Sequence, residues 1–310
     1  MTAFAIQIAL VLGVLATFAL GPGLAIAFLI LRKRRRRARG RSPIGIDLLR
    51  TPGHTVREQL DEAMSDLIWD VMLLSLMPMG FLSIYLAQGH VIGLPRMVPL
   101  MPLYIGAGLL IIGVVVRKMI KAGEQIDNLR AGYDAELAVG QELDKLMLSG
   151  ARVFHDFPAE NFNIDHVVIS AQGVFAVETK GYTKPGDLKG REGATVVLDD
   201  QALRFPHWTT SEPLEQAERQ AKWLSKWMTS AIGELVFVTP VVALPGWYVD
   251  DKRRDRNSLR VYSGRALEHL VDSPSRQPLI AQDVQRIAHQ VDQRCRTVVP
   301  TYRRDPEKAR

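Results

Sequence analysis

The chain has 310 residues, and 39 Lys and Arg against 33 Asp and Glu give it a net charge of +6. Eight of the positive charges lie between Arg32 and Arg41, so the remainder, 31 basic against 33 acidic residues, is nearly neutral and does not by itself indicate a nucleic-acid surface. The single cysteine, Cys295, excludes an intrachain disulfide and fits a reducing compartment.

Three apolar stretches predict three transmembrane helices, over residues 1–31, 67–89 and 97–116. Residues 1–31 carry no charged side chain, and a stretch of this length can cross a hydrocarbon core of about 30 Å. The basic run follows this stretch instead of preceding it, so we interpret the stretch as an uncleaved anchor and not as a signal peptide. The alternative for the basic run is a nuclear-type signal or a nucleic-acid-binding arm.

The basic residues also predict the topology, because Lys and Arg accumulate in cytoplasmic loops. Residues 32–66 would form a basic cytoplasmic loop with a short amphipathic helix over Thr55–Met64, which begins with a Thr55–Glu58 capping box. Residues 89–96 would lie outside, and everything after Arg117 would lie inside. We therefore expect a multi-pass protein of the cell (inner or plasma) membrane whose soluble domain faces the cytoplasm.

After a linker over 117–132, residues 133–300 have the pattern of a soluble α/β domain, and 301–310 form a polar tail. A helix is expected over 133–149, where Gly150 ends it. The order helix, three strands, helix, strand is typical of an α/β sandwich. The other expected elements are strands over 152–157, 163–170, 174–180, 235–242 and 261–263, a hairpin of 195–198 with 202–205, and helices over 212–229 and 281–294.

The strands on either side of Ala171-Gln172-Gly173 predict a β-hairpin. A two-residue loop at Ala171-Gln172 places Asp165 opposite Glu178, whereas a loop at Gln172-Gly173 places it opposite Lys180. Glu178 and Lys180 are two residues apart and share a face of the strand, so both registers gather two carboxylates and an ammonium group on that face. A three-residue loop would instead place Asp165 opposite Thr179.

Two neighbouring carboxylates suit a divalent cation that keeps positions open for water and phosphate. Such an ion can activate water and stabilise the charge that develops on a phosphoryl oxygen. A lysine beside the carboxylates can orient that water or neutralise the transition state. The alternative is a half-exposed hairpin whose outer face carries an ordinary ion pair.

The order Asp165…Glu178-Thr179-Lys180 resembles the metal-dependent PD-(D/E)xK nuclease core, with Ile164 at the proline-like position. More closely, the segment from Ile164 to Lys180 resembles the nuclease-related domain (NERD) family. The Gly-Glu pair of that family's first helix corresponds to Ala135-Glu136, where alanine departs from the glycine. The family's Asn-Pro-Leu-x-Gln segment is similar to Glu212-Pro213-Leu214-Glu215-Gln216, where Glu212 departs from the asparagine.

The resemblance implies a fold and a set of roles. The fold would be α/β, a restriction-endonuclease-like αβββαβ core preceded by the three transmembrane helices. Asp165 and Glu178 would hold Mg²⁺ or Mn²⁺, and Lys180 would position water or the scissile phosphate. Glu136 would complete the outer shell, and Gln216 would lie near the metal site.

The leading hypothesis is a membrane-anchored nuclease that hydrolyses the phosphodiester bonds of DNA or RNA on the cytoplasmic side. One alternative is a nuclease-fold module without turnover that tethers nucleic acid or a protein to the membrane. Another is a membrane scaffold or stress-response component with a protein partner. The near-neutral soluble part favours these alternatives, whereas the joint presence of Asp165, Glu178 and Lys180 favours the enzyme. We expect His166 to be a core or interface histidine, with a catalytic role as the alternative. Trp223 and Trp227 lie four residues apart on one helix, which indicates packing, and base stacking is the alternative.

Overall fold

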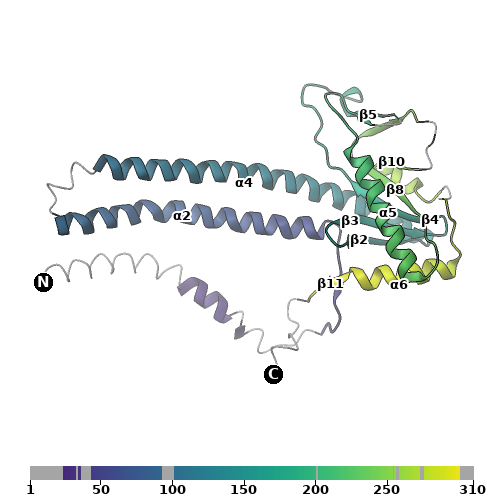
Figure 1. Cartoon of the computed structure of the whole chain (residues 1–310), viewed down its shortest axis with the longest axis horizontal. Coiled ribbons are helices and arrows are strands. Elements are labelled where there is room, and N and C mark those ends of the chain that lie inside the picture. Colours follow the sequence, from purple (N-terminus) through teal and green to yellow (C-terminus); the bar gives the residue numbers. More distant parts are fainter. Residues whose placement is uncertain are drawn as a thin grey trace. The chain divides into compact units, whose positions relative to one another are not determined.

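The computed structural model describes residues 24–32, 34–35, 43–92, 101–199, 202–253, 255, 258–272 and 276–300 (Figure 1). The chain divides into two compact units. The first comprises Met1–Gly45, Asp61–Ile126 and Pro300–Arg310, and the second comprises Ile46–Leu60 and Asp127–Val299. The polar tail expected over 301–310 and most of the span expected over 1–31 lie outside the described residues.

Two long helices, α2 (His54–Ile92) and α4 (Met101–Asp144), supply most of the described part of the first unit. Helical stretches over His54–Ser83 and Met101–Ser149 are long and apolar enough to cross a membrane. Inside this unit, Lys118 Nζ lies 2.8 Å from Asp70 Oδ1, so this acidic residue of the second apolar stretch has a basic partner. The described helices therefore provide two candidate spans, where the sequence predicts three.

The helix boundaries in this region differ from the prediction. The short helix expected over 55–64 is not separate from the span expected over 67–89, because α2 runs through both. No glycine or proline interrupts the sequence between His54 and Met77, and Pro78 lies inside the helix without ending it. The capping box is also wrong, since Thr55 Oγ1 donates to Asp156 and not to its own helix.

The second unit is built on a five-stranded sheet of order β10-β8-β4-β3-β2. Strands β2 (Arg152–Pro158), β3 (Asn163–Ser170) and β4 (Gly173–Thr179) form an antiparallel meander. Strand β8 (Val238–Leu244) then pairs parallel with β4, and β10 (Arg260–Ser263) pairs parallel with β8. Helix α5 (Glu212–Ile232) connects β4 to β8 along the chain, and α6 (Ala281–Cys295) follows β10. The fold is therefore mixed α/β, with the predicted order of helix, three strands, helix and strand.

Smaller elements complete this unit. A four-stranded sheet of order β7-β6-β5-β9 contains the predicted hairpin, since β5 (Thr195–Leu198) pairs antiparallel with β6 (Leu203–Arg204). Strands β7 (Thr209–Thr210) and β9 (Tyr248–Asp251) lie at its edges. Strand β1 (Leu48–Leu49) pairs antiparallel with β11 (Arg296–Val298). In the described residues, short 3₁₀ helices span Lys145–Ser149, Glu192–Ala194 and Arg265–His269. The first ends at Gly150, whose φ of 87° is the expected left-handed stop.

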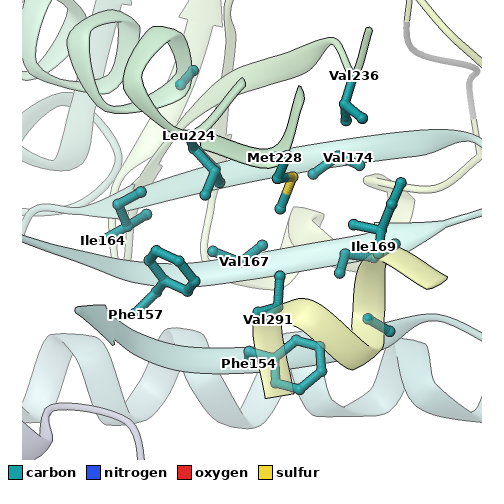
Figure 2. Packing of buried hydrophobic residues seen from close by; sticks show 14 of the residues in the cluster. Phe154, Phe157, Ile164, Val167, Ile169, Val174, Leu224, Met228, Val236 and Val291 are labelled. Atoms are coloured by element: carbon teal, nitrogen blue, oxygen red, sulfur yellow. The ribbon is translucent and has the colours of Figure 1, made fainter. Parts of the chain in front are cut away.

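Apolar side chains cover both faces of the five-stranded sheet. On one face, β2, β3 and β4 pack against α5 and α6 through residues such as Val167, Leu224, Met228 and Val291 (Figure 2). On the other face, Val168, Phe175 and Val177 pack against Val139 and Leu143 of α4. Trp223 and Trp227 contact the Phe157 ring edge-on, so these tryptophans pack in the core as expected. The sheet is thereby held between helices, and its strand ends are fixed in place.

Candidate functional site

The β3–β4 hairpin takes one of the two predicted registers. Ser170 pairs with Gly173, which leaves Ala171-Gln172 as a two-residue turn, and the ladder continues to His166 opposite Val177. Gly173 has a φ of 135°, a conformation that side-chain-bearing residues rarely adopt. One step beyond the last pair, Asp165 lies opposite Glu178. The register with Asp165 opposite Lys180 is therefore wrong.

The side chain of Asp165 ends the ladder of backbone hydrogen bonds between β3 and β4. Its Oδ2 accepts a hydrogen bond of 2.7 Å from the backbone N–H of Thr179, in place of the next strand-to-strand bond. Asp165 keeps some exposed surface, but protein atoms enclose its carboxyl group, and this burial raises its pKa well above the usual range. The nearby charges of Glu178 and Glu136 raise that pKa further. The carboxyl groups of this region therefore repel one another.

Glu178 is buried and both of its oxygens have partners. Lys180 Nζ lies 2.8 Å from Oε1, and Gln220 Nε2 donates to Oε2 at 2.6 Å. Burial alone would lower the pKa of Lys180, but the charge and hydrogen bond of Glu178 and the charge of Asp165 outweigh it and raise that pKa. Lys180 thus stays an ammonium group, and its side chain keeps 23% of its surface exposed, which a ligand can reach.

Helix α5 brings two glutamines to this pair. Gln216 Oε1 accepts a hydrogen bond of 3.0 Å from Lys180 Nζ, so the predicted site residue contacts the lysine. Gln220 lies one turn further along, on the same face of the helix. Gln220 is not among the residues predicted from the sequence, although its spacing of four residues from Gln216 places both on one helix face. Its Oε1 is buried and has no hydrogen-bond partner among the described residues.

Glu136 approaches from α4. Burial is the largest of the effects that raise its pKa to about 7, and the charges of Asp156 and Glu178 add to it. The charge of Lys180 and a hydrogen bond from the Gly53 backbone act in the opposite direction. Glu136 is therefore within electrostatic range of Glu178 and Lys180.

A close helix–strand contact fixes this approach. A Cβ added at Gly181, directly after Lys180, would lie 2.7 Å from the Ala135 Cβ and 2.9 Å from the Ala131 carbonyl oxygen. Glycine is therefore required where the end of β4 meets α4 beside Glu136.

His166 lies on the opposite face of the sheet, away from Asp165. It is fully buried, and its Nδ1 lies 2.9 Å from Nδ1 of His155, whose Nε2 lies 3.1 Å from Asp144 Oδ1. Burial lowers the pKa values of both histidines. His166 is thus a core histidine, as expected.

The donor set can be tested against the implied divalent cation. Within the described part of the chain, no three Asp, Glu, His or Cys side chains come close enough together to hold one ion. Mg²⁺ is commonly bound by one or two carboxylates, with water and phosphate oxygens in the remaining positions. Asp165 and Glu178, which repel one another beside a single ammonium group, fit that mode of binding.

Comparison with protein families gives a match over part of the chain. The family model of the nuclease-related domain (NERD) matches residues 131–245, a range that contains Glu136, Asp165, Glu178, Lys180 and Gln216. Comparison with curated proteins and with solved structures gives no significant match. Residues 131–245 of this chain are therefore similar to the nuclease-related domain (NERD) family.

Proposed function

We propose that this chain is a membrane-anchored, metal-dependent nuclease that hydrolyses phosphodiester bonds of DNA or RNA. The observation that carries the proposal is the set around Glu178, in which Asp165 lies opposite and Lys180 bridges to Gln216. The same side chains lie in a domain whose family is nuclease-related.

Each residue has a role that follows from its position. Asp165 and Glu178 would hold Mg²⁺ or Mn²⁺, which when bound polarises a phosphoryl oxygen and makes water more acidic. Lys180 can release Glu178 and donate its hydrogen bond to a non-bridging phosphate oxygen, where charge builds up in the transition state. Gln216 limits the positions that the ammonium group can take. Glu136, with a pKa of about 7, suits a proton acceptor near neutral pH.

The apolar helices and the basic residues support a location of this activity at the membrane. We infer that α2 and α4 anchor the protein in the cell membrane, because both contain stretches long and apolar enough to cross it. The basic run at 32–41 and the basic residues after 116 favour the cytoplasm for the nuclease-related domain. The substrate would then be cytoplasmic nucleic acid.

One observation favours a second candidate, a nuclease-fold module that binds nucleic acid without cutting it. Both oxygens of Glu178 are already engaged, by Lys180 and Gln220, so the carboxylate is neutralised without a metal. In this alternative Lys180 contacts a phosphate, and no turnover follows.

A binding and cleavage experiment on the purified full-length chain separates the two. Asp165→Asn and Glu178→Gln should abolish Mn²⁺ binding in calorimetric titrations, and Asp187→Asn, which changes an exposed carboxylate paired with His207, should not. The wild type should cut labelled DNA or RNA with Mg²⁺ or Mn²⁺ and not with EDTA. A chain that binds nucleic acid but never cuts it would establish the tether, and Mn²⁺ binding that survives both site substitutions would refute the metal assignment.

A further inference from the structure

The segment Ile46–Leu60 belongs to the same compact unit as the nuclease-related domain, although it precedes the matched residues in the chain. Its strand β1 pairs with β11, where Leu48 lies opposite Val298 and Leu49 opposite Arg296. The backbone N–H of Arg50 donates to the Cys295 carbonyl, and Arg50 Nε donates to Thr297 Oγ1 at 2.8 Å. The segment is thus held against the end of α6.

Asp156 of β2 binds the following residues of the segment, Arg50 and Thr55, through its carboxylate. This aspartate is 3% exposed and has a φ of 49°, an uncommon conformation for a residue with a side chain. Its Oδ2 accepts hydrogen bonds from Arg50 Nη1 at 2.8 Å, from Thr55 Oγ1 at 2.7 Å and from the Thr55 backbone N–H at 3.2 Å. The Thr55 N–H is one of the free donors at the start of α2, so Asp156 acts as a helix cap supplied from another element.

Between Arg50 and Thr55, Gly53 meets Glu136. Its φ is 67°, and a Cβ added there would lie 2.7 Å from the Tyr133 ring and 3.7 Å from the Glu136 Cβ. The Gly53 backbone also provides the hydrogen bond to the Glu136 carboxyl group. Arg50 and Thr55, which both donate hydrogen bonds to Asp156, therefore lie on either side of Gly53 in the chain, and Gly53 contacts Glu136.

A second route leads from the same aspartate to Glu178. Asn163 Nδ2 donates to Asp156 Oδ1 at 3.1 Å and to Thr55 Oγ1 at 2.6 Å. The Asn163 carbonyl oxygen accepts a bond of 3.4 Å from Gln220 Nε2, the group that also holds Glu178. Asp156 is thus linked to Glu136 through Gly53 and to Glu178 through Asn163 and Gln220.

We propose that Arg50–Thr55, which lies outside the matched family region, contributes to the activity of the nuclease site. Asp156 and Gly53 are positioning residues for Glu136. Asp156 holds the segment, and the segment holds Glu136 beside Lys180. This proposal rests on the proposed nuclease function. Partners of this kind, which orient the residues of a site, typically contribute 10- to 100-fold to activity or metal affinity, by order of magnitude.

Kinetics on the full-length chain test the positioning role. Thr55→Val removes the hydroxyl donor to Asp156 at nearly constant size, and Asp156→Asn removes the charge while keeping a residue that tolerates positive φ. Both should lower kcat on labelled DNA by about tenfold or more at unchanged KM, because the segment holds Glu136 and not the substrate. Thr55→Ser should restore kcat. Glu58→Gln, which changes only the exposed pair with His54, should match the wild type.

Hydrogen exchange of the peptide over residues 50–57 tests the contact itself without any cleavage. Glu136→Ala should speed exchange there by removing the acceptor for Gly53, whereas Glu136→Gln should keep it slow because an amide oxygen still accepts. Unchanged exchange in Glu136→Ala would overturn the inference whether or not the wild type cleaves. Lower melting temperatures for Thr55→Val and Asp156→Asn with unchanged kcat would show that the segment only stabilises the fold. That result would also overturn the inference. A wild type that shows the exchange pattern but never cleaves would instead defeat the proposed function.

Discussion

Glu136 combines a buried position with a carboxyl group that resists ionisation. Its pKa is about 7 in the folded chain, against 4.5 for the unperturbed group. Between these values the folded state binds the proton more tightly than the unfolded state, so stability decreases as the pH rises from about 4.5 to about 7. Glu136→Gln removes this penalty and should stabilise the metal-free domain at pH 8 by on the order of 1–3 kcal/mol.

The tryptophan-fluorescence melting temperature of the full-length chain in EDTA measures this effect. The Glu136→Gln chain should melt higher than the wild type at pH 8, and the gain should shrink towards zero near pH 4.5. An equal gain in melting temperature at both pH values would mean that the amide improves packing and that ionisation of Glu136 does not destabilise the fold.

Lys180 competes with any cation for Glu178, since its ammonium group lies 2.8 Å from Oε1. Lys180→Ala should therefore leave Mn²⁺ affinity unchanged or raise it, while the cleavage rate falls by on the order of a hundredfold because a transition-state donor is lost. Calorimetry and single-turnover cleavage on the same preparation measure both. Lys184→Ala, an exposed lysine of the following loop, is the control. A parallel loss of Mn²⁺ affinity in Lys180→Ala would contradict this account.

At the scale of elements, the position of α4 against the end of β4 depends on Gly181. A methyl group there would lie 2.7 Å from the Ala135 side chain and 2.9 Å from a backbone oxygen, which cannot move without shifting the helix. Gly181→Ala should destabilise the domain by about 1–3 kcal/mol. Gly186→Ala has open space around its added Cβ and should change stability little. The domain's melting transition compares them, and similar behaviour of the two variants would refute the close contact.

The sequence predicted elements wherever the signal was local. The alternation of side chains and the turn at Ala171-Gln172 placed Asp165, Glu178 and Lys180 together, and the Gln216 motif on α5 joined them. Asp156 was missed because its role depends on contacts with distant segments, which no periodic pattern encodes, whereas Gln220 was missed although it lies one helical turn after Gln216. The cap of α2 was mispredicted for the same reason as Asp156, since it comes from Asp156 of β2 and not from the helix's own first turn.

At the scale of the whole molecule, the order of segments limits how the chain can cross a membrane. Residues Ile46–Leu60 and Asp127–Val299 form one compact unit, joined by the β1–β11 pairing and by Arg50 on Asp156. Both parts must therefore lie on the same side. The chain between them can cross only an even number of times, which agrees with the two apolar helices found there.

We expect residues 46–60 and 127–299 in the cytoplasm and the connection between α2 and α4 outside, because basic residues flank the two helices on the cytoplasmic side. In intact cells, a membrane-impermeant thiol reagent should leave Glu58→Cys and Glu218→Cys equally unlabelled and should label both after permeabilisation. The native Cys295 is buried, and burial raises its pKa to about 12, so its background labelling should be low. Reporter fusions at residues 50, 92 and 310 should report inside, outside and inside. Labelling of only one of the two cysteines in intact cells would refute the shared unit. Labelling of both in intact cells would agree with a shared unit but would place it outside the cell, and cytoplasmic nucleic acid would then be excluded as the substrate.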